Sequence, residues 1–257
     1  MVNPLKEVPE RVQRQKIQVL SLDGKTKDPE SFKETFYRNE PRLPGGGILG
    51  QLTTKGYDQA FDVGQYLKQR YGPVTSDQVY IRSTNIYRTI ETARGVYCGW
   101  RNGEVDPTKE IFVEGDNSNE FMFPNGEMPY AGKQMKWIWE APGLNEEIRK
   151  LNEDILATLK VDFDSDFSGR HPIYLRDDIT ARWEHDFEIN SDKFTKQDLD
   201  RVMPKIQKCA ADLLYLIGCD SERMEKETMP IVSGRLLDYI TRTTSKYAIL
   251  GAHDTTG

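Results

Sequence analysis

Two apolar runs of this chain end in charged side chains. Residues 79–81 lead into Arg82, and residues 247–252 lead into His253 and Asp254. In an open parallel sheet, ligands bind in the crevice outside the carboxyl ends of the strands. If both runs are strands of one such sheet, a guanidinium, an imidazole and a carboxylate converge on one site. We predict that these three side chains form the functional site.

The three groups suit the chemistry of a phosphate ester. Arginine binds two phosphate oxygens in a planar fork, histidine donates to a third oxygen, and a carboxylic acid protonates the leaving alkoxide. The alternative is that these residues have only structural roles. A lone arginine usually pairs with a surface acid, and a polar pair at a strand end often hydrogen-bonds to its own loop. The turn Ser83-Thr84-Asn85 after Arg82, at the predicted start of a helix, favours phosphate binding because helix N-termini attract anions.

Alternating strands and helices are predicted around these runs. Strands are expected near residues 16–22, 78–82, 110–114 and 247–250. A helix capped by Thr53 or Thr54 ends before Gly72-Pro73, and a second helix begins near Asn85. Such alternation is typical of a mainly parallel sheet. The fold class is therefore predicted to be α/β.

The middle of the chain lacks this alternation. We interpret residues 120–220 as an inserted lobe, and residues 1–119 with 221–257 as the α/β core. Within the lobe, one amphipathic helix is expected over 145–159. Another begins with a capping box at Thr195 and Asp198 and continues to about 217. A further helix, which carries Leu236, Leu237 and Ile240, is expected to lead into the last strand.

Composition excludes several classes of function. The 257 residues carry a net charge of −6, and the basic residues form no stripe that would bind a nucleic acid backbone. The longest apolar stretch, 213–219, is far shorter than the about 20 residues of a membrane span. Neither the cysteines nor the histidines have the spacing of metal ligands: these are Cys98, Cys209, Cys219, His171 and His185. We expect no metal and no cofactor. Compartment and oligomeric state are not assigned.

Several of these segments resemble the signatures of the histidine acid phosphatases. Residues 81–89, Ile-Arg-Ser-Thr-Asn-Ile-Tyr-Arg-Thr, and 252–256, Ala-His-Asp-Thr-Thr, are similar to the second and third signatures of that family. Residues 47–56 resemble its glycine-rich lead into the first long helix. Residues 121–125, Phe-Met-Phe-Pro-Asn, most resemble the branch that hydrolyses lysophosphatidic acid. Order and spacing match from about Asn3 to the last residue.

The resemblance implies a fold and a reaction. The fold would be a three-layer, phosphoglycerate mutase-like sheet with a mostly helical cap. The reaction would be hydrolysis of a small phosphomonoester or lysophospholipid through a phosphohistidine, without a metal. Arg82 and His253 would bind the phosphoryl oxygens, and Asp254 would protonate the leaving alcohol.

The family's nucleophile motif is not found in this sequence. The nucleophile is a histidine in Arg-His-Gly-x-Arg-x-Pro, and the histidines here are His171, His185 and His253. We favour truncation at both ends as the explanation, because the chain stops within the third signature at Gly257. The alternatives are a pseudo-phosphatase that binds or senses a phosphate ligand, and a fragment that does not fold alone. The chain as given is expected to be inactive.

Overall fold

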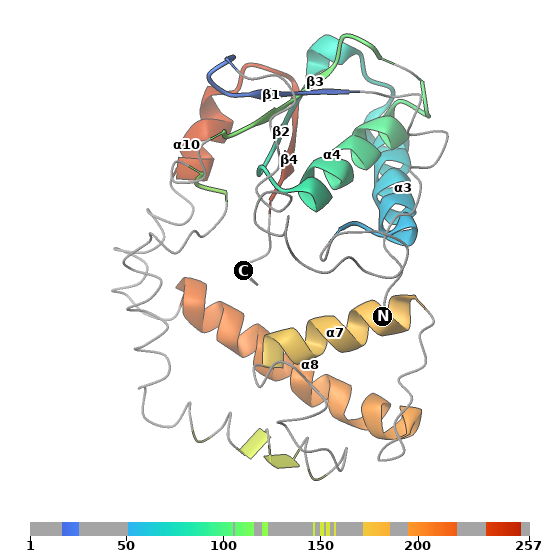
Figure 1. Cartoon of the computed structure of the whole chain (residues 1–257), viewed down its shortest axis with the longest axis vertical. Helices are drawn as coiled ribbons and strands as arrows, with labels where there is room; N and C mark the ends of the chain where they lie inside the picture. The colour runs from blue at the N-terminus through green and yellow to red at the C-terminus, as the bar shows by residue number, and fades with distance from the viewer. Residues whose placement is uncertain are drawn as a thin grey trace, which may run out of the picture. The chain divides into compact units, whose positions relative to one another are not determined.

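A computed structural model describes residues 17–25, 51–104, 106–115, 120–122, 172–185, 195–219 and 235–252, together with scattered positions between 146 and 157. The chain divides into two compact units (Figure 1). One consists mainly of Asn3–Asn125 and Arg235–Thr255, and the other mainly of Gly126–Gly234. The sequence placed the inserted lobe at 120–220, and that boundary stays a prediction.

The first unit contains a four-stranded parallel sheet (Figure 1). The order of strands is β1-β3-β2-β4, so β2 lies between β3 and β4. Every pair is parallel, and all carboxyl ends therefore lie at one edge of the sheet. The predicted parallel α/β arrangement is confirmed. The strands are β1 (Gln18–Ser21), β2 (Val79–Ser83), β3 (Glu110–Val113) and β4 (Tyr247–Gly251).

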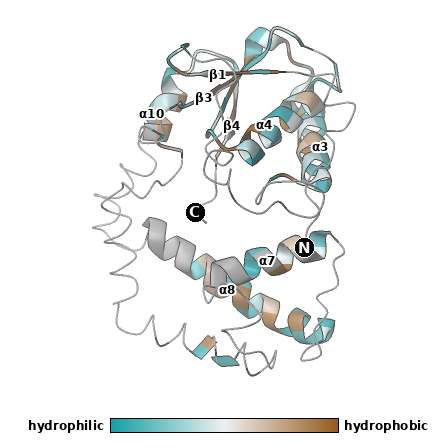
Figure 2. Ribbon diagram, in the orientation of Figure 1, coloured by the Kyte–Doolittle hydropathy of each residue, from teal (hydrophilic) through white to brown (hydrophobic). Residues whose placement is uncertain are grey.

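Helix α3 (Thr54–Tyr71) has the ends that the sequence predicted. The Thr53 hydroxyl oxygen accepts the backbone N–H of Gly56 at 3.0 Å, which satisfies one of the unpaired amides of the first turn. The helix ends at Gly72, whose φ of 81° is accessible to glycine at little cost. Figure 2 shows hydrophilic and hydrophobic residues mixed along α3, as expected for a helix with one face on a core.

Helix α4 (Tyr87–Trp100) connects β2 to the rest of the unit and packs closely on α3. Glycines permit the close approach. A methyl group at Gly64 would overlap the Val96 carbonyl oxygen, and one at Gly99 would overlap the Phe61 carbonyl oxygen. The two helices thus touch through their backbones, which fixes the position of α4 relative to its neighbour.

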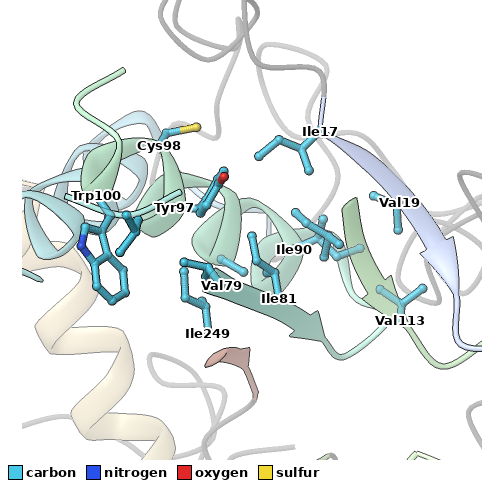
Figure 3. Packing of buried hydrophobic residues seen from close by; sticks show 13 residues of the cluster. Ile17, Val19, Val79, Ile81, Ile90, Tyr97, Cys98, Trp100, Val113 and Ile249 are labelled. Atoms are coloured by element: carbon cyan, nitrogen blue, oxygen red, sulfur yellow. The ribbon is translucent and has the colours of Figure 1, made fainter. Parts of the chain in front are cut away.

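The core of this unit lies between the sheet and α4 (Figure 3). Ile81 and Ile111 are fully buried on the two inner strands, and Tyr97 of α4 is buried as well. Burial of these side chains stabilises the sheet by roughly 1.5–3 kcal/mol per large apolar residue. The core includes Val79 and Ile81 of β2, the strand that carries the candidate arginine. The buried cluster consists of Ile17, Val19, Val74, Val79, Ile81, Ile90, Ala93, Tyr97, Cys98, Trp100, Ile111, Val113 and Ile249.

The second unit contains helices α7 (Pro172–Glu184) and α8 (Lys196–Cys219), which pack against each other. The predicted capping box is confirmed: the Asp198 carboxylate accepts the Thr195 N–H at 2.9 Å, and the Thr195 hydroxyl accepts the Asp198 N–H at 3.3 Å. The sequence analysis missed α7. The predicted helix over 145–159 is described only at scattered positions, which are helical.

Helix α10 (Arg235–Arg242) belongs to the first unit and leads into β4. Of the apolar residues that the sequence placed on it, Leu237 and Ile240 are exposed. Tyr239 is half-buried and lies near β2, where its hydroxyl is hydrogen-bonded to that of Tyr80. Among the described helices, none has the length and apolar character that crossing a bilayer requires.

Candidate active site

Arg82 lies near the carboxyl end of an interior strand, next to the strand that leads to His253. In the ladder between β2 and β4, Arg82 is opposite Leu250 and Ser83 is opposite Gly251. The Thr84 N–H extends this pairing by donating to the Gly251 carbonyl oxygen at 2.8 Å. The two predicted strands are thus hydrogen-bonded neighbours. His253 and Asp254 lie outside the described residues, so their convergence with Arg82 stays a prediction.

The turn after Arg82 is buried, and hydrogen bonds from its own hydroxyl groups stabilise it. The Thr84 and Thr89 hydroxyls are hydrogen-bonded at 2.7 Å, and the Thr89 hydroxyl also lies 2.7 Å from the Ile86 carbonyl oxygen. Ser83, Thr84 and Asn85 are all buried. This network joins the end of β2 to the first turn of α4. The polar segment of the signature therefore supports the arginine structurally.

Arg82 is buried completely and forms a salt bridge. Its Nη2 donates to Glu120 Oε1 at 3.0 Å, and the Glu120 side chain is 2% exposed. The sequence analysis missed Glu120, which is 38 residues away along the chain. The one signal available was its place directly before the segment Phe-Met-Phe-Pro-Asn that carried part of the resemblance.

Two aromatic rings contact the guanidinium. The Arg82 Cζ atom lies 4.2 Å from the centroid of the Phe121 ring and 4.7 Å from that of Tyr239. The two ring centroids are 5.5 Å apart and the ring planes are inclined at 55°. Such cation–π contacts contribute about 2 kcal/mol when desolvated. Sequence reasoning also missed both rings, because they come from separate segments.

The hydrogen-bonding capacity of this pair is only partly used. Arg82 Nε and Nη1 and Glu120 Oε2 are buried, and they have no hydrogen-bond partner in the part of the chain that the structure describes. Native proteins seldom leave buried polar atoms unsatisfied, and a charged donor is costly to leave so. An anion bound to Nε–H and the second N–H of Nη2, which lie on one edge of the guanidinium, would remove part of this cost. Arg82 is therefore suited to bind an anion.

Burial also alters the acidity of Glu120. Loss of contact with water raises the pKa of its carboxyl group, and the charge of Glu114 raises it further. The backbone N–H of Met122, which donates to Oε1 at 2.8 Å, and the Arg82 guanidinium oppose this increase. Because the direction is upward, Glu120 takes up a proton more readily than an exposed glutamate does.

The remaining histidine and cysteine predictions can be compared with the structure in part. His185 Nδ1 lies 2.7 Å from the Ala181 carbonyl oxygen, one turn earlier in the chain, and His171 lies outside the described residues. Cys98 is buried and Cys209 partly buried, and neither forms a disulfide. Within the described ranges, no group of three or more histidine, cysteine, aspartate or glutamate side chains is arranged to hold a metal ion.

A family model decides the relationship of this chain to known proteins. The model of the histidine phosphatase superfamily (branch 2) matches residues 3–213. The chain belongs to this family. The resemblance inferred from the motifs is therefore confirmed, and the family match includes Arg82 and Glu120.

Curated relatives extend the match over nearly the whole chain. Lysophosphatidic acid phosphatase type 6 from Mus musculus is 29% identical over 265 residues, which cover 93% of this chain and 58% of the relative. The protein of the same name from Homo sapiens is 27% identical, with coverage of 99% and 61%. Human testicular acid phosphatase is 43% identical over 56 residues. The chain thus spans about 60% of the length of the lysophosphatidic acid phosphatases.

A solved structure supports the fold. The phytase of Klebsiella sp ASR1 superposes with a TM-score of 0.57 at 17% sequence identity, over 88% of this chain and 66% of the phytase. At this level of identity, the similarity is one of fold. Together with the family match, it confirms the α/β class with a parallel sheet.

Proposed function

We propose that this chain provides the phosphoryl-binding part of a histidine acid phosphatase that acts on phosphomonoesters. One observation carries the proposal: the buried Arg82 guanidinium has two nitrogens without partners among the described residues, at the carboxyl edge of a parallel sheet. The strand beside it continues in the sequence to His253 and Asp254. The relatives named as lysophosphatidic acid phosphatases support lysophosphatidic acid as the candidate substrate.

In the proposed reaction, each residue has a defined role. Arg82 binds phosphoryl oxygens through Nε–H and the second N–H of Nη2, which lie on one edge of the guanidinium, and His253 donates to another oxygen. A histidine nucleophile forms a bond to phosphorus while the bond to the ester oxygen breaks, and Asp254 protonates the departing alkoxide. Water then attacks the phosphohistidine, gives a proton to Asp254 and releases phosphate. No metal is required in this scheme, because the cationic side chains neutralise the phosphoryl charge.

The motif that carries the nucleophile in this scheme is not found in the sequence given. None of the three histidines lies in an Arg-His-Gly motif. We therefore expect the chain alone to bind phosphate but not to hydrolyse phosphomonoesters. Incubation with a generic phosphomonoester at acid pH tests this expectation. Sustained turnover that purified protein retains through further chromatography and loses on His253→Ala would contradict it.

The second candidate function is that of a phosphate-binding or regulatory module without catalysis. The binding groups seen around Arg82, in a chain without the nucleophile motif, favour it over other classes. The two candidates differ in what a longer chain would do. A chain with an Arg-His-Gly segment joined in frame before Met1 hydrolyses phosphomonoesters if the first proposal holds and stays inactive if the second does.

Titration calorimetry with inorganic phosphate tests the proposed binding site. Arg82→Lys keeps the positive charge but loses the planar fork, and we expect it to weaken phosphate binding by about tenfold to a hundredfold. Arg94→Lys is the matched control, since Arg94 is also paired with a buried glutamate, and its affinity should equal that of the unchanged chain. A cooperative thermal transition for each protein is required first. Equal affinity in Arg82→Lys and the unchanged chain would refute the site.

A further inference from the structure

Glu120 uses only one of its two carboxyl oxygens in the hydrogen bonds that hold it. Its Oε1 accepts from Arg82 Nη2 at 3.0 Å and from the backbone N–H of Met122 at 2.8 Å. Its Oε2 is buried and has no hydrogen-bond partner in the described part of the chain. The carboxyl group is thus fixed through one oxygen, and the other is available to a ligand.

The unsatisfied nitrogens of Arg82 lie close to this oxygen. Nε and Nη1 are bonded to the same carbon as Nη2, and Nη2 is hydrogen-bonded to the partner oxygen of Oε2. The side chains that carry the unsatisfied donors and the unsatisfied acceptor are therefore joined by the hydrogen bond from Nη2 to Oε1. Nε–H and the second N–H of Nη2 point the same way along one edge of the planar guanidinium. A tetrahedral anion that accepts from both would share Nη2 with Glu120 and lie beside its carboxyl group.

Charge limits what such an anion can be. Among the described residues, the charged groups that act on Glu120 are Arg82 on β2 and Glu114 after β3, while α10 places Tyr239 against the arginine. Within this part of the chain, one guanidinium does not neutralise both an ionised carboxylate and a dianion, and like charges repel strongly in a buried site. A proton between the carboxyl group and the anion removes that repulsion and forms a hydrogen bond.

We infer that Glu120 is a specificity-determining residue, which selects a phosphoryl group that carries one proton. This inference rests on the phosphoryl site proposed for Arg82. The P–OH of a phosphate monoanion donates to Glu120 Oε2, while other oxygens of the anion accept from Arg82 Nε and from the second N–H of Nη2. The same complex forms when a protonated Glu120 binds the dianion, because the total number of protons is equal.

Sulfate differs from phosphate in the one property that this selection uses. It has the same tetrahedral shape but no proton to donate near neutral pH, whereas phosphomonoesters have a second pKa of about 6 and carry a proton in mild acid. Sulfate therefore binds only when Glu120 itself takes up a proton. The upward shift of the Glu120 pKa caused by burial makes that uptake possible. Its affinity should fall by about tenfold per pH unit above the pKa of Glu120.

The test compares inorganic phosphate and inorganic sulfate by titration calorimetry on the whole chain, from about pH 5 to about pH 8. We expect phosphate to bind more tightly than sulfate near pH 6.5, by about tenfold or more. This is the gain in affinity that one hydrogen bond to a charged group provides. Repeating the titrations in buffers of different ionisation enthalpy measures how many protons are taken up for each anion bound. Sulfate binding should take up about one proton per anion, and phosphate binding fewer.

Glu120→Gln separates the charge of this side chain from its geometry. The glutamine carbonyl oxygen can accept both bonds now made to Oε1, and its NH₂ group, in place of Oε2, donates to any anion. We expect sulfate affinity near pH 6.5 to rise by about tenfold, the phosphate preference to disappear, and proton uptake with sulfate to vanish. Glu91→Gln, which neutralises another buried glutamate paired with arginine, should keep the preference of the unchanged chain.

The outcomes separate this inference from the proposed function on which it rests. If phosphate binds at Arg82 but is not preferred over sulfate, or if Glu120→Gln keeps the preference and the proton count, the role of Glu120 is refuted while the site stands. If neither anion binds the folded chain, the proposed phosphoryl site is refuted and the inference falls with it.

Discussion

The α/β unit contains two buried glutamate–arginine pairs, Arg82–Glu120 and Arg94–Glu91. In both, burial raises the pKa of the carboxyl group, and one carboxyl oxygen has no partner among the described residues. They differ in the arginine. Arg94 pairs with Glu91 within α4, and its other terminal nitrogen donates to the Ile17 carbonyl oxygen at 3.1 Å.

The Arg82 pair is formed between distant segments and is less completely satisfied. Arg94 is 17% exposed and uses both terminal nitrogens, whereas Arg82 has no exposure and uses one. Aromatic rings contact the Arg82 guanidinium, which lies at the carboxyl edge of the sheet. The comparison shows that a buried ion pair does not by itself indicate a binding site. One unsatisfied nitrogen does not indicate a site either, because Arg94 Nε also has no partner among the described residues. Arg82 differs because two of its three nitrogens, Nε and Nη1, are unsatisfied and because it lies at the carboxyl edge of the sheet.

The largest expected effect comes from removing each arginine. Arg82→Met leaves the Glu120 carboxyl buried without its cation, and we expect the free energy of unfolding to fall by about 3–5 kcal/mol. Arg94→Met should cost less, because water reaches the Arg94 side chain and can solvate Glu91. Urea denaturation monitored by circular dichroism measures both.

A double variant sharpens this comparison. Arg82→Met combined with Glu120→Leu replaces the pair by apolar groups, and most of the lost stability should return, because neither charge is then buried. If the double variant is as unstable as Arg82→Met alone, the loss came from packing and not from the unpaired carboxylate. Equal losses in Arg82→Met and Arg94→Met would remove the difference between the two pairs.

A smaller effect is expected at the ring from α10. Tyr239→Leu removes the cation–π contact with Arg82 and the hydrogen bond to Tyr80, and should destabilise the chain by about 1–3 kcal/mol. Tyr239→Phe keeps the ring and should lose about 1 kcal/mol. Thermal unfolding measures both variants. Were Tyr239→Phe to cost as much as Tyr239→Leu, the ring would contribute nothing to holding the guanidinium.

These side chains mark the limit of what the sequence could predict. Strand β2, the Thr53 cap and the capping box at Thr195 follow from patterns of a few residues, and the structure confirms them. Tyr239 carries no local signal, and the one signal at Glu120 is its place before residues 121–125. Both side chains reach Arg82 only once β2, β3 and α10 are packed. Sequence patterns give the strand ends where a site can form, whereas the groups that surround it depend on tertiary packing.

Helix α7 was missed for a different physical reason. Its apolar residues do not form a single stripe along the helix, so the periodicity that identified α3 and α8 is weak there. Its stability comes from packing on α8, which a local pattern does not report. The roles of His253 and Asp254 stay predictions from the motif.

The smallest expected effect is a dependence of stability on pH. A carboxyl group whose pKa is raised in the folded state contributes stability below its unfolded pKa and loses that contribution as pH rises through the folded pKa. Both Glu91 and Glu120 have raised pKa values. Glu120→Gln should therefore flatten the decline in unfolding free energy between pH 4.5, the ordinary glutamate value, and neutrality. Denaturation at several pH values gives the free energy of unfolding as a function of pH. Parallel profiles for the variant and the unchanged chain would contradict this expectation.

Nuclear magnetic resonance of the arginine side chains tests the central claim most directly. In ¹⁵N-labelled protein, the Nε–H signals of Arg82 and Arg94 can be assigned from Arg82→Lys and Arg94→Lys and followed as inorganic phosphate is added. Our account predicts that the Arg82 Nε–H signal moves to lower field with saturation at the phosphate affinity found by calorimetry, while the Arg94 signal stays in place. Saturable phosphate binding that leaves the Arg82 signal unmoved would contradict it.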